Sequence, residues 1–257
     1  YASATTAIGH KALTALTTGV GNTAVGYQSG KAITGGAANT VMGYGALDLL
    51  TTGNHNIAIG HDAANAMDAG ESHNYAIGSD SMGSMDEGSS GTIDYNIAIG
   101  YTALLGGAMS SSDVVTGCMA IGHNSLNSTG TNPQTGTIAI GKDALTAVTS
   151  GSKNTAIGYQ AGDTLTTGYE NTIVGHLADT DANSRAGCVI IGYNLSLNTA
   201  SDNVVEIGND TNSMTYDLDG GDITVTSDVR TKTNIKDSSL GLEFINKLRP
   251  VTYETKP

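Results

Sequence analysis

The sequence predicts an all-β protein: a parallel β-solenoid or β-roll of about twelve coils of about 17 residues, intertwined or packed as a homotrimer, with a short C-terminal α-helical segment. A phrase Asn-Thr-Ala-Ile-Gly-Tyr, or a close variant, recurs twelve times with its glycines 16 to 22 residues apart. The 257 residues include 35 Gly but one Phe and no Trp. Because so short a period cannot hold a domain, each copy is expected to be one coil of a rod on the order of 55 Å long. The motif glycines are Gly9, Gly26, Gly43, Gly60, Gly78, Gly100, Gly122, Gly141, Gly158, Gly175, Gly192 and Gly208.

Each motif predicts one short strand followed by a corner. The residue before the motif glycine is always aliphatic, and the residue before that is Ala in eight copies. This alternation predicts a strand with one bulky face and one face that permits close contact. The glycine allows a left-handed or crowded backbone at the corner.

Four residues before the motif glycine stands Asn in seven copies, which predicts a ladder of stacked side-chain amides. Cys118 and Cys188 hold this position in two other copies. Four coils would separate them by about 19 Å, too far for a disulfide within one chain, so buried free thiols are expected. The asparagines are Asn22, Asn39, Asn56, Asn74, Asn96, Asn154 and Asn171.

The position after the motif glycine holds four of the six His and five of the eleven Tyr. One interpretation is an aromatic ladder that packs coil on coil or chain on chain. The other is a functional stripe that stacks on sugar rings, or histidines from several chains that hold an ion. Regularity through the coils favours packing. The position is filled by His10, Tyr27, Tyr44, His61, Ser79, Tyr101, His123, Lys142, Tyr159, His176, Tyr193 and Asn209.

The fifth to seventh copies carry longer connections, at 84–91, 106–117 and 129–136. Insertions in a solenoid are expected to leave the rod as loops, often on one face. These loops are the predicted contacts to a receptor or glycan. The candidate binding residues are Asp86, Glu87, Ser111, Asp113, Asn132 and Gln134.

The net charge of −13 is unevenly spread. Residues 1–226 hold 20 acidic and 5 basic residues, whereas 227–257 hold 4 and 6. An acidic solenoid repels nucleic acid and anionic membranes, so no nucleic acid partner is expected. No apolar run is long enough to span a bilayer, so no membrane insertion is expected. The sequence shows no metal-binding loop, and neither a metal nor a cofactor is expected.

Composition divides the chain into a repeat solenoid over 1–208, a polar connector over 209–226 and a distinct C-terminal segment over 227–257. In the last segment Leu240, Phe244 and Leu248 form an apolar stripe at helical spacing, which predicts a helix. Asp237 or Ser238 can cap its start, and Arg249-Pro250 ends it.

Two signatures resemble known proteins. The repeat is similar to the head repeats of trimeric autotransporter adhesins and to those of many phage tail-fibre proteins. Ser-Asp-x-Arg-x-Lys-x-Asn-Ile from Ser227 to Ile235, followed by the helix and Leu-Arg-Pro-Val-x-Tyr, resembles the start of the endosialidase-type intramolecular chaperone of phage fibres and spikes. That family's domain continues further, whereas this sequence ends at Pro257, so a truncated domain is expected.

The resemblance implies a parallel homotrimer whose C-terminal chaperone aligns the three chains and often then releases itself. Carried onto this sequence, the cut would fall between Thr226 and Ser227, with Ser227 as nucleophile and Lys232 as its base. The chemistry is consistent, because a serine hydroxyl needs a neighbouring base and a desolvated lysine can serve as one.

The leading hypothesis is a structural and host-attachment component of a phage tail fibre, located in the virion outside the cell. Its expected partners are two further copies of the chain, a host cell-surface glycan or protein receptor, and other virion tail proteins. The alternative is a bacterial trimeric surface adhesin that binds host matrix or glycans. That class typically contains a coiled coil, but no heptad repeat is visible in this sequence. A glycan-degrading tailspike needs two carboxylates facing a groove, and no convincing pair is present, so no substrate-directed enzyme activity is expected.

Overall fold

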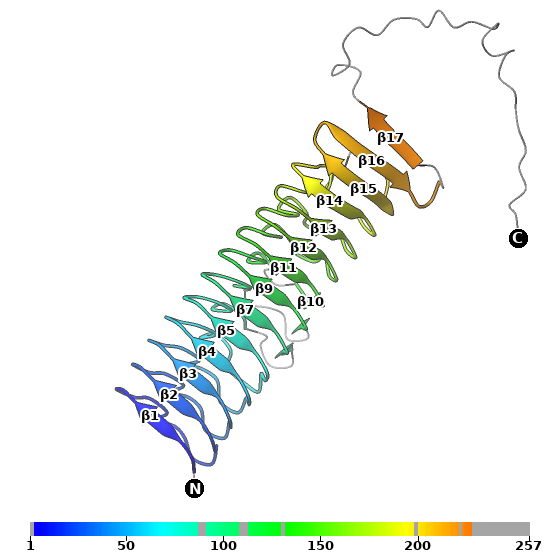
Figure 1. Ribbon diagram of the computed structural model, residues 1–257. Helices are drawn as coiled ribbons and strands as arrows, with labels where there is room; N and C mark the ends of the chain where they lie inside the picture. The colour runs from blue at the N-terminus through cyan, green and yellow to red at the C-terminus, as the bar shows by residue number, and fades with distance from the viewer. Residues whose placement is uncertain are drawn as a thin grey trace, which may run out of the picture. The chain divides into compact units, whose positions relative to one another are not determined.

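The computed structural model describes residues 3–86, 91–107, 113–129, 132–197, 200–220 and, by backbone alone, 223–227. Its main element is one 14-stranded sheet in the order β1-β2-β3-β4-β5-β7-β9-β11-β12-β13-β14-β15-β16-β17 (Figure 1). From β1 to β15, each strand pairs in parallel with the strand of the next coil. The predicted all-β parallel solenoid is therefore confirmed. The strands of this sheet are β1 (Thr6–Ile8), β2 (Thr23–Val25), β3 (Thr40–Met42), β4 (Ile57–Ile59), β5 (Tyr75–Ile77), β7 (Ile97–Ile99), β9 (Met119–Ile121), β11 (Ile138–Ile140), β12 (Thr155–Ile157), β13 (Thr172–Val174), β14 (Val189–Tyr193), β15 (Val204–Asn209), β16 (Asn212–Asp217) and β17 (Ile223–Ser227).

The solenoid is wound by one chain. Every strand pair joins two coils of the same chain, and the register keeps equivalent motif positions opposite each other, as Ala76 opposite Ala98. Each coil therefore closes its own backbone hydrogen bonds and core.

The small face of each strand is the inner one. From β2 to β15 the middle residue of each motif strand is buried, as Ala58 and Ala98 are, whereas the aliphatic residue before the motif glycine is half-buried or exposed, as with Ile99 at 38%. Alanine in the strand leaves the interior to Leu47, Leu104 and equivalent residues that follow the corner. Burial of these side chains, about 1.5–3 kcal/mol each, is the main term that offsets the entropy of ordering the coils.

Large and small residues compensate each other across this thin core. Where Ile173 replaces the usual strand alanine, the facing position holds Gly162. A Cβ at Gly162 would lie 3.0 Å from Ile173 Cδ1 and 2.8 Å from Leu145 Cδ2. The interior volume therefore stays filled although the residue types change from coil to coil.

The predicted asparagine ladder runs through the interior of the coils. Asn56 is buried, and its Nδ2 donates to Asn39 Oδ1 at 3.1 Å and to the Glu71 carbonyl oxygen at 2.7 Å. Its Oδ1 accepts from the backbone N–H of Asn74 at 3.0 Å. Each ladder asparagine thus satisfies backbone groups that would otherwise be buried without partners, at about 1–3 kcal/mol for each group left unpaired.

The two cysteines occupy the ladder position as predicted. Both are buried free thiols, and their backbone N–H groups donate to Asn96 Oδ1 and Asn171 Oδ1. Burial raises the pKa of the Cys118 thiol to about 11, which keeps it protonated and unreactive at neutral pH.

The segment after the last repeat, expected as a connector, extends the sheet instead. β16 pairs with β15 antiparallel. The turn between them forms because Asn209 Oδ1 accepts from the backbone N–H of Thr211 and of Asn212, at 3.0 and 2.8 Å. Glu206 fills the inner position that alanine holds in other coils, and it accepts a hydrogen bond of 2.6 Å from Ser213 Oγ. The hairpin thus supplies a hydrogen-bond donor to the buried Glu206 carboxylate, at the end of the apolar interior.

The chain separates into two compact units, residues 1–226 and residues 227–257. The helix predicted around Leu240, Phe244 and Leu248 lies outside the described residues. Within the residues that are described, no helix is long and apolar enough to cross a membrane.

Candidate functional site

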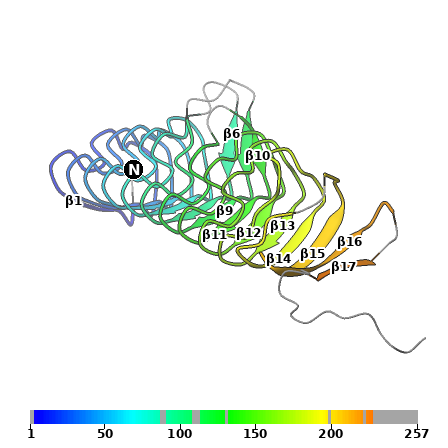
Figure 2. The same ribbon diagram turned by 90° about the horizontal axis from the view of Figure 1, so that it is seen from above.

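The three long connections build a second, smaller sheet. It consists of β6 (Thr92–Asp94), β8 (Val114–Thr116) and β10 (Gln134–Thr135), paired in parallel in the order β10-β8-β6. Figure 2 shows β6 and β10 on a different side of the solenoid from the large sheet. Ile93 and Val115 are fully buried beneath it. The second and third connections therefore each contribute a strand and a buried residue, and β6 follows directly after the first; the central residues of all three connections lie outside the described part of the chain.

The candidate contact residues in these connections have different environments. Asp86, Asp113 and Asn132 are half-buried, and the Asn132 backbone N–H donates to the Thr129 carbonyl at 3.2 Å. Glu87 and Ser111 lie outside the described residues. The three described residues are therefore partly accessible to a ligand, and Asp113 directly precedes β8.

Asp86 belongs to an acidic neighbourhood. Burial, followed by the charges of Glu71 and Asp86, raises the pKa of Asp68. Glu71 is itself buried, and its carboxylate accepts hydrogen bonds from the backbone N–H groups of Asp68 and Ala69 at 3.0 Å. This part of the surface would favour a cationic or hydrogen-bond-donating ligand over an anionic one.

Gln134 is not a surface contact, which corrects the sequence prediction. Its side chain is fully buried, and Nε2 donates to the Thr149 carbonyl oxygen at 2.7 Å. In this coil Thr137 stands at the ladder position, and its Oγ1 lies 3.4 Å from Gln134 Oε1. Gln134 thus supplies the amide that asparagine supplies elsewhere. Thr137, at a position where asparagine is usual, was the sequence signal for this role of Gln134.

The residues after the motif glycine form the predicted aromatic ladder. Ring centroids of neighbouring coils lie 4.9 to 5.4 Å apart in stacked pairs from His10 to His61 and from Tyr159 to Tyr193. Each stacked pair contributes about 0.5–1.5 kcal/mol beyond area burial. Packing of coil on coil is therefore confirmed, although the rings stay accessible, with Tyr44 54% exposed.

Sequence reasoning missed a second aromatic ladder. His55, His73 and Tyr95 stack with centroids 5.0 and 4.9 Å apart. All three stand five residues before a motif glycine and have positive φ, from 57° to 62°. The signal was present as a fixed position in the repeat, but only three copies carry a ring there.

Ser227, the candidate nucleophile, is the last residue of β17, and Lys232, its candidate base, lies outside the described residues. Residues 227–257 match the family model described as the chaperone of endosialidase. The start of that match coincides with the division between the two compact units, after Thr226. No curated protein and no solved structure matches the chain. The C-terminal segment is therefore similar to this chaperone family, and the solenoid fold of the preceding residues is established by strand pairing alone.

Proposed function

We propose that the chain is a structural rod of a phage tail fibre, assembled as a homotrimer by its C-terminal chaperone segment, and that it attaches the virion to a host cell. The observation that carries the proposal is the sequence order: a β-solenoid is followed directly by a segment similar to the chaperone of endosialidase. A rod built of coils supplies length and stiffness, whereas a folding chaperone at its end suits a chain whose copies must start in register.

The outer face of the large sheet supports the homotrimer. Each of the twelve parallel strands presents outward the first residue of its Thr-Ala-Ile-like triplet and the residue before the motif glycine, and none of these 24 positions is charged. Ile99, Ile157 and Ile191 on this face are about 40% exposed. On a chain with a net charge of −13, a continuous uncharged and largely aliphatic face is suited to contact between copies.

Self-release by the chaperone segment is the first part of the proposal to test. The unmodified chain should be cut between Thr226 and Ser227. Ser227→Ala removes the proposed nucleophile, so the variant chain should remain full length on a denaturing gel. Thr231→Ala, at a variable position of the same signature, serves as the matched control and should still cleave. Cleavage of the Ser227→Ala chain at the same bond would contradict the assignment of Ser227 and Lys232.

Host attachment is proposed to use the surface around β6, β8 and β10. A variant with Ala at Asp86, Glu87, Ser111, Asp113 and Asn132 should bind at least tenfold more weakly to cells, because it removes the polar side chains proposed as contacts in the three long connections. The measurement is binding of the fluorescently labelled full chain to bacterial strains that differ in surface polysaccharide. Gln134 is left unchanged because its side chain is part of the core.

The control for this variant removes an exposed ion pair elsewhere on the solenoid. Lys153 Nζ lies 2.9 Å from Glu170 Oε1, and both side chains are more than half exposed. Replacing both with Ala should leave cell binding unchanged. Equal binding by the five-residue variant and the unmodified chain would remove the small sheet as the attachment surface.

A further inference from the structure

The position two residues after the motif glycine forms a polar ladder along the solenoid. Thr102 Oγ1 donates to Asn124 Oδ1 at 2.5 Å, and Asn124 Nδ2 donates to Asp143 Oδ1 at 3.1 Å. Near the end of the solenoid, Asn194 Nδ2 donates to Asp210 Oδ2 at 3.2 Å. In these coils, each residue with a carboxylate or an amide oxygen meets a donor from the neighbouring coil.

Asp62 and Asp80 break this rule of complementary neighbours. They occupy the same ladder in consecutive coils, after β4 and β5, so two carboxylates stack where other coils pair a donor with an acceptor. Asp62 Oδ2 lies 3.2 Å from His61 Nδ1, at ion-pair distance. Within the described part of the chain, no lysine or arginine forms an ion pair with either carboxylate. Two adjacent carboxylates with a single imidazole beside them favour a bound cation.

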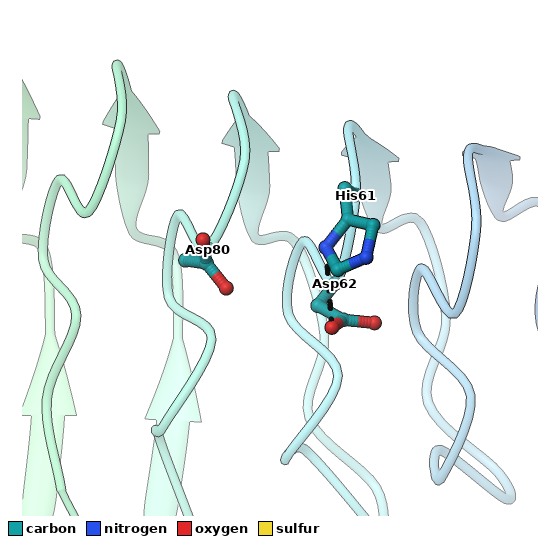
Figure 3. Close-up of side chains that lie close together, drawn as sticks. All are labelled: His61, Asp62 and Asp80. Carbon is teal, nitrogen blue, oxygen red and sulfur yellow. Dashed lines mark ion pairs between the residues drawn. The ribbon is translucent and has the colours of Figure 1, made fainter.

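The aromatic ladder is interrupted at the same place. His61 stacks on Tyr44 with centroids 5.2 Å apart, but the next coil holds Ser79 where a ring would continue the stack. Ser79 Oγ donates to Asp80 Oδ2 at 2.8 Å, which fixes the orientation of that carboxylate. The imidazole therefore has a stacked ring on one side and no ring on the other. Figure 3 shows His61 and Asp62 on one coil and Asp80 on the neighbouring coil.

The donor atoms are close enough to share one ion. His61, Asp62 and Asp80 each offer one ligand atom, and these atoms lie within 4.8 Å of one another. Ligands of a metal ion bound at about 2.0–2.2 Å lie about 3–4 Å apart, so a small movement of the exposed His61 and the half-buried aspartates completes the site. Gly45, in the coil before, leaves room for this group, because a Cβ there would collide with Asp62 Oδ1.

We propose that His61, Asp62 and Asp80 bind a divalent transition-metal ion, with Zn²⁺ as the best-fitting member, and that water completes the coordination. One imidazole nitrogen with two carboxylates suits zinc, whereas calcium and magnesium prefer sites made of oxygen alone. The ion ties the fourth coil to the fifth, directly before the first long connection. This site goes beyond the proposed fibre function and departs from the expectation of no metal.

The test is titration of the full chain, free of any histidine tag, with zinc chloride by calorimetry and by thermal unfolding. The unmodified chain should bind zinc with one saturable site per chain, and zinc should raise its unfolding temperature. His61→Tyr should weaken that binding at least tenfold and abolish the thermal shift. The variant keeps the fold, because Tyr27 and Tyr44 fill the same position in earlier coils. Asp80→Asn should give the same loss while preserving the size of the side chain.

Two controls separate this site from general binding to the ladders. His10→Tyr makes the same change in a ladder ring with no aspartate beside it, and it should leave zinc affinity unchanged. Asp143→Asn removes a ladder carboxylate whose pKa is already lowered by its hydrogen bond with Lys142, and it should also be silent. Absence of saturable zinc binding, or equal binding by His61→Tyr and the unmodified chain, would overturn the proposal.

Discussion

Gly141→Ala should lower the free energy of unfolding of the solenoid by about 3–5 kcal/mol, because it combines strained backbone with overpacking. Gly141 has φ of +137°, and a Cβ there would collide with the carbonyl oxygen of Gly158 in the next coil. Eleven of the twelve motif glycines share this conformation, with φ from 133° to 154°. The backbone of one coil therefore occupies the space that a side chain in the previous coil would need.

Gly136→Ala is the matched control for this prediction. Gly136 also has positive φ, at +60°, but a Cβ there meets nothing within 4 Å. It stands five residues before a motif glycine, where Lys153 and Glu170 adopt φ of 61° and 59°. Its replacement should cost about 1 kcal/mol. The measurement is the unfolding temperature of both variants from circular dichroism melting curves. Similar unfolding temperatures would contradict the claim that crowding at Gly141 makes its replacement costly.

A lysine on the outer sheet face should separate the proposed trimer into single chains. Ile99→Lys and Ile157→Lys, combined, place two charges on β7 and β12, where neighbouring copies are proposed to meet. Burying an unpaired charge costs several kcal/mol per site and recurs in all three copies. The fold of the single chain should survive, because both side chains point away from its core and are 38% and 39% exposed.

Leu49→Lys is the matched control for the sheet-face variant. Leu49 is a large apolar residue with 45% exposure, but it lies in a turn and not on the outer sheet face. The variant should keep the mass of the unmodified assembly. Light scattering coupled to gel filtration measures the mass, and circular dichroism checks that each variant remains folded. Retention of the trimer by the double lysine variant would exclude this face as the contact.

Much of the fold could be predicted because each position of the repeat has the same surroundings in many coils. The asparagine ladder, the cysteines within it and the crowded glycine corner each follow from one position read down all coils. The inner and outer faces of the strands could not be assigned, because neither face is charged in most copies. Ala58 and Ile59 are both apolar, and only the structure shows that alanine faces inward.

The candidate site was harder to predict for local reasons. β6 and β8 are three residues each; β6 directly follows the first insertion and β8 lies within the second, so no repeat supports them. Gln134 has polar character typical of a loop, and its role in the core depends on Thr137 standing where asparagine is usual. The approach of Asp62 and Asp80 depends on the exact strand register between β4 and β5. Pairings of this kind are set by three-dimensional spacing and not by any local motif.

The central claim is that this solenoid is a homotrimeric fibre whose copies meet through an uncharged sheet face. The most direct test is the mass of the purified full chain in solution, measured by light scattering at several concentrations. For the uncleavable Ser227→Ala chain, the account predicts a particle of three times the 26.0 kDa chain mass that does not dissociate on dilution. A monodisperse particle of one chain mass, with the solenoid intact by circular dichroism, would contradict it.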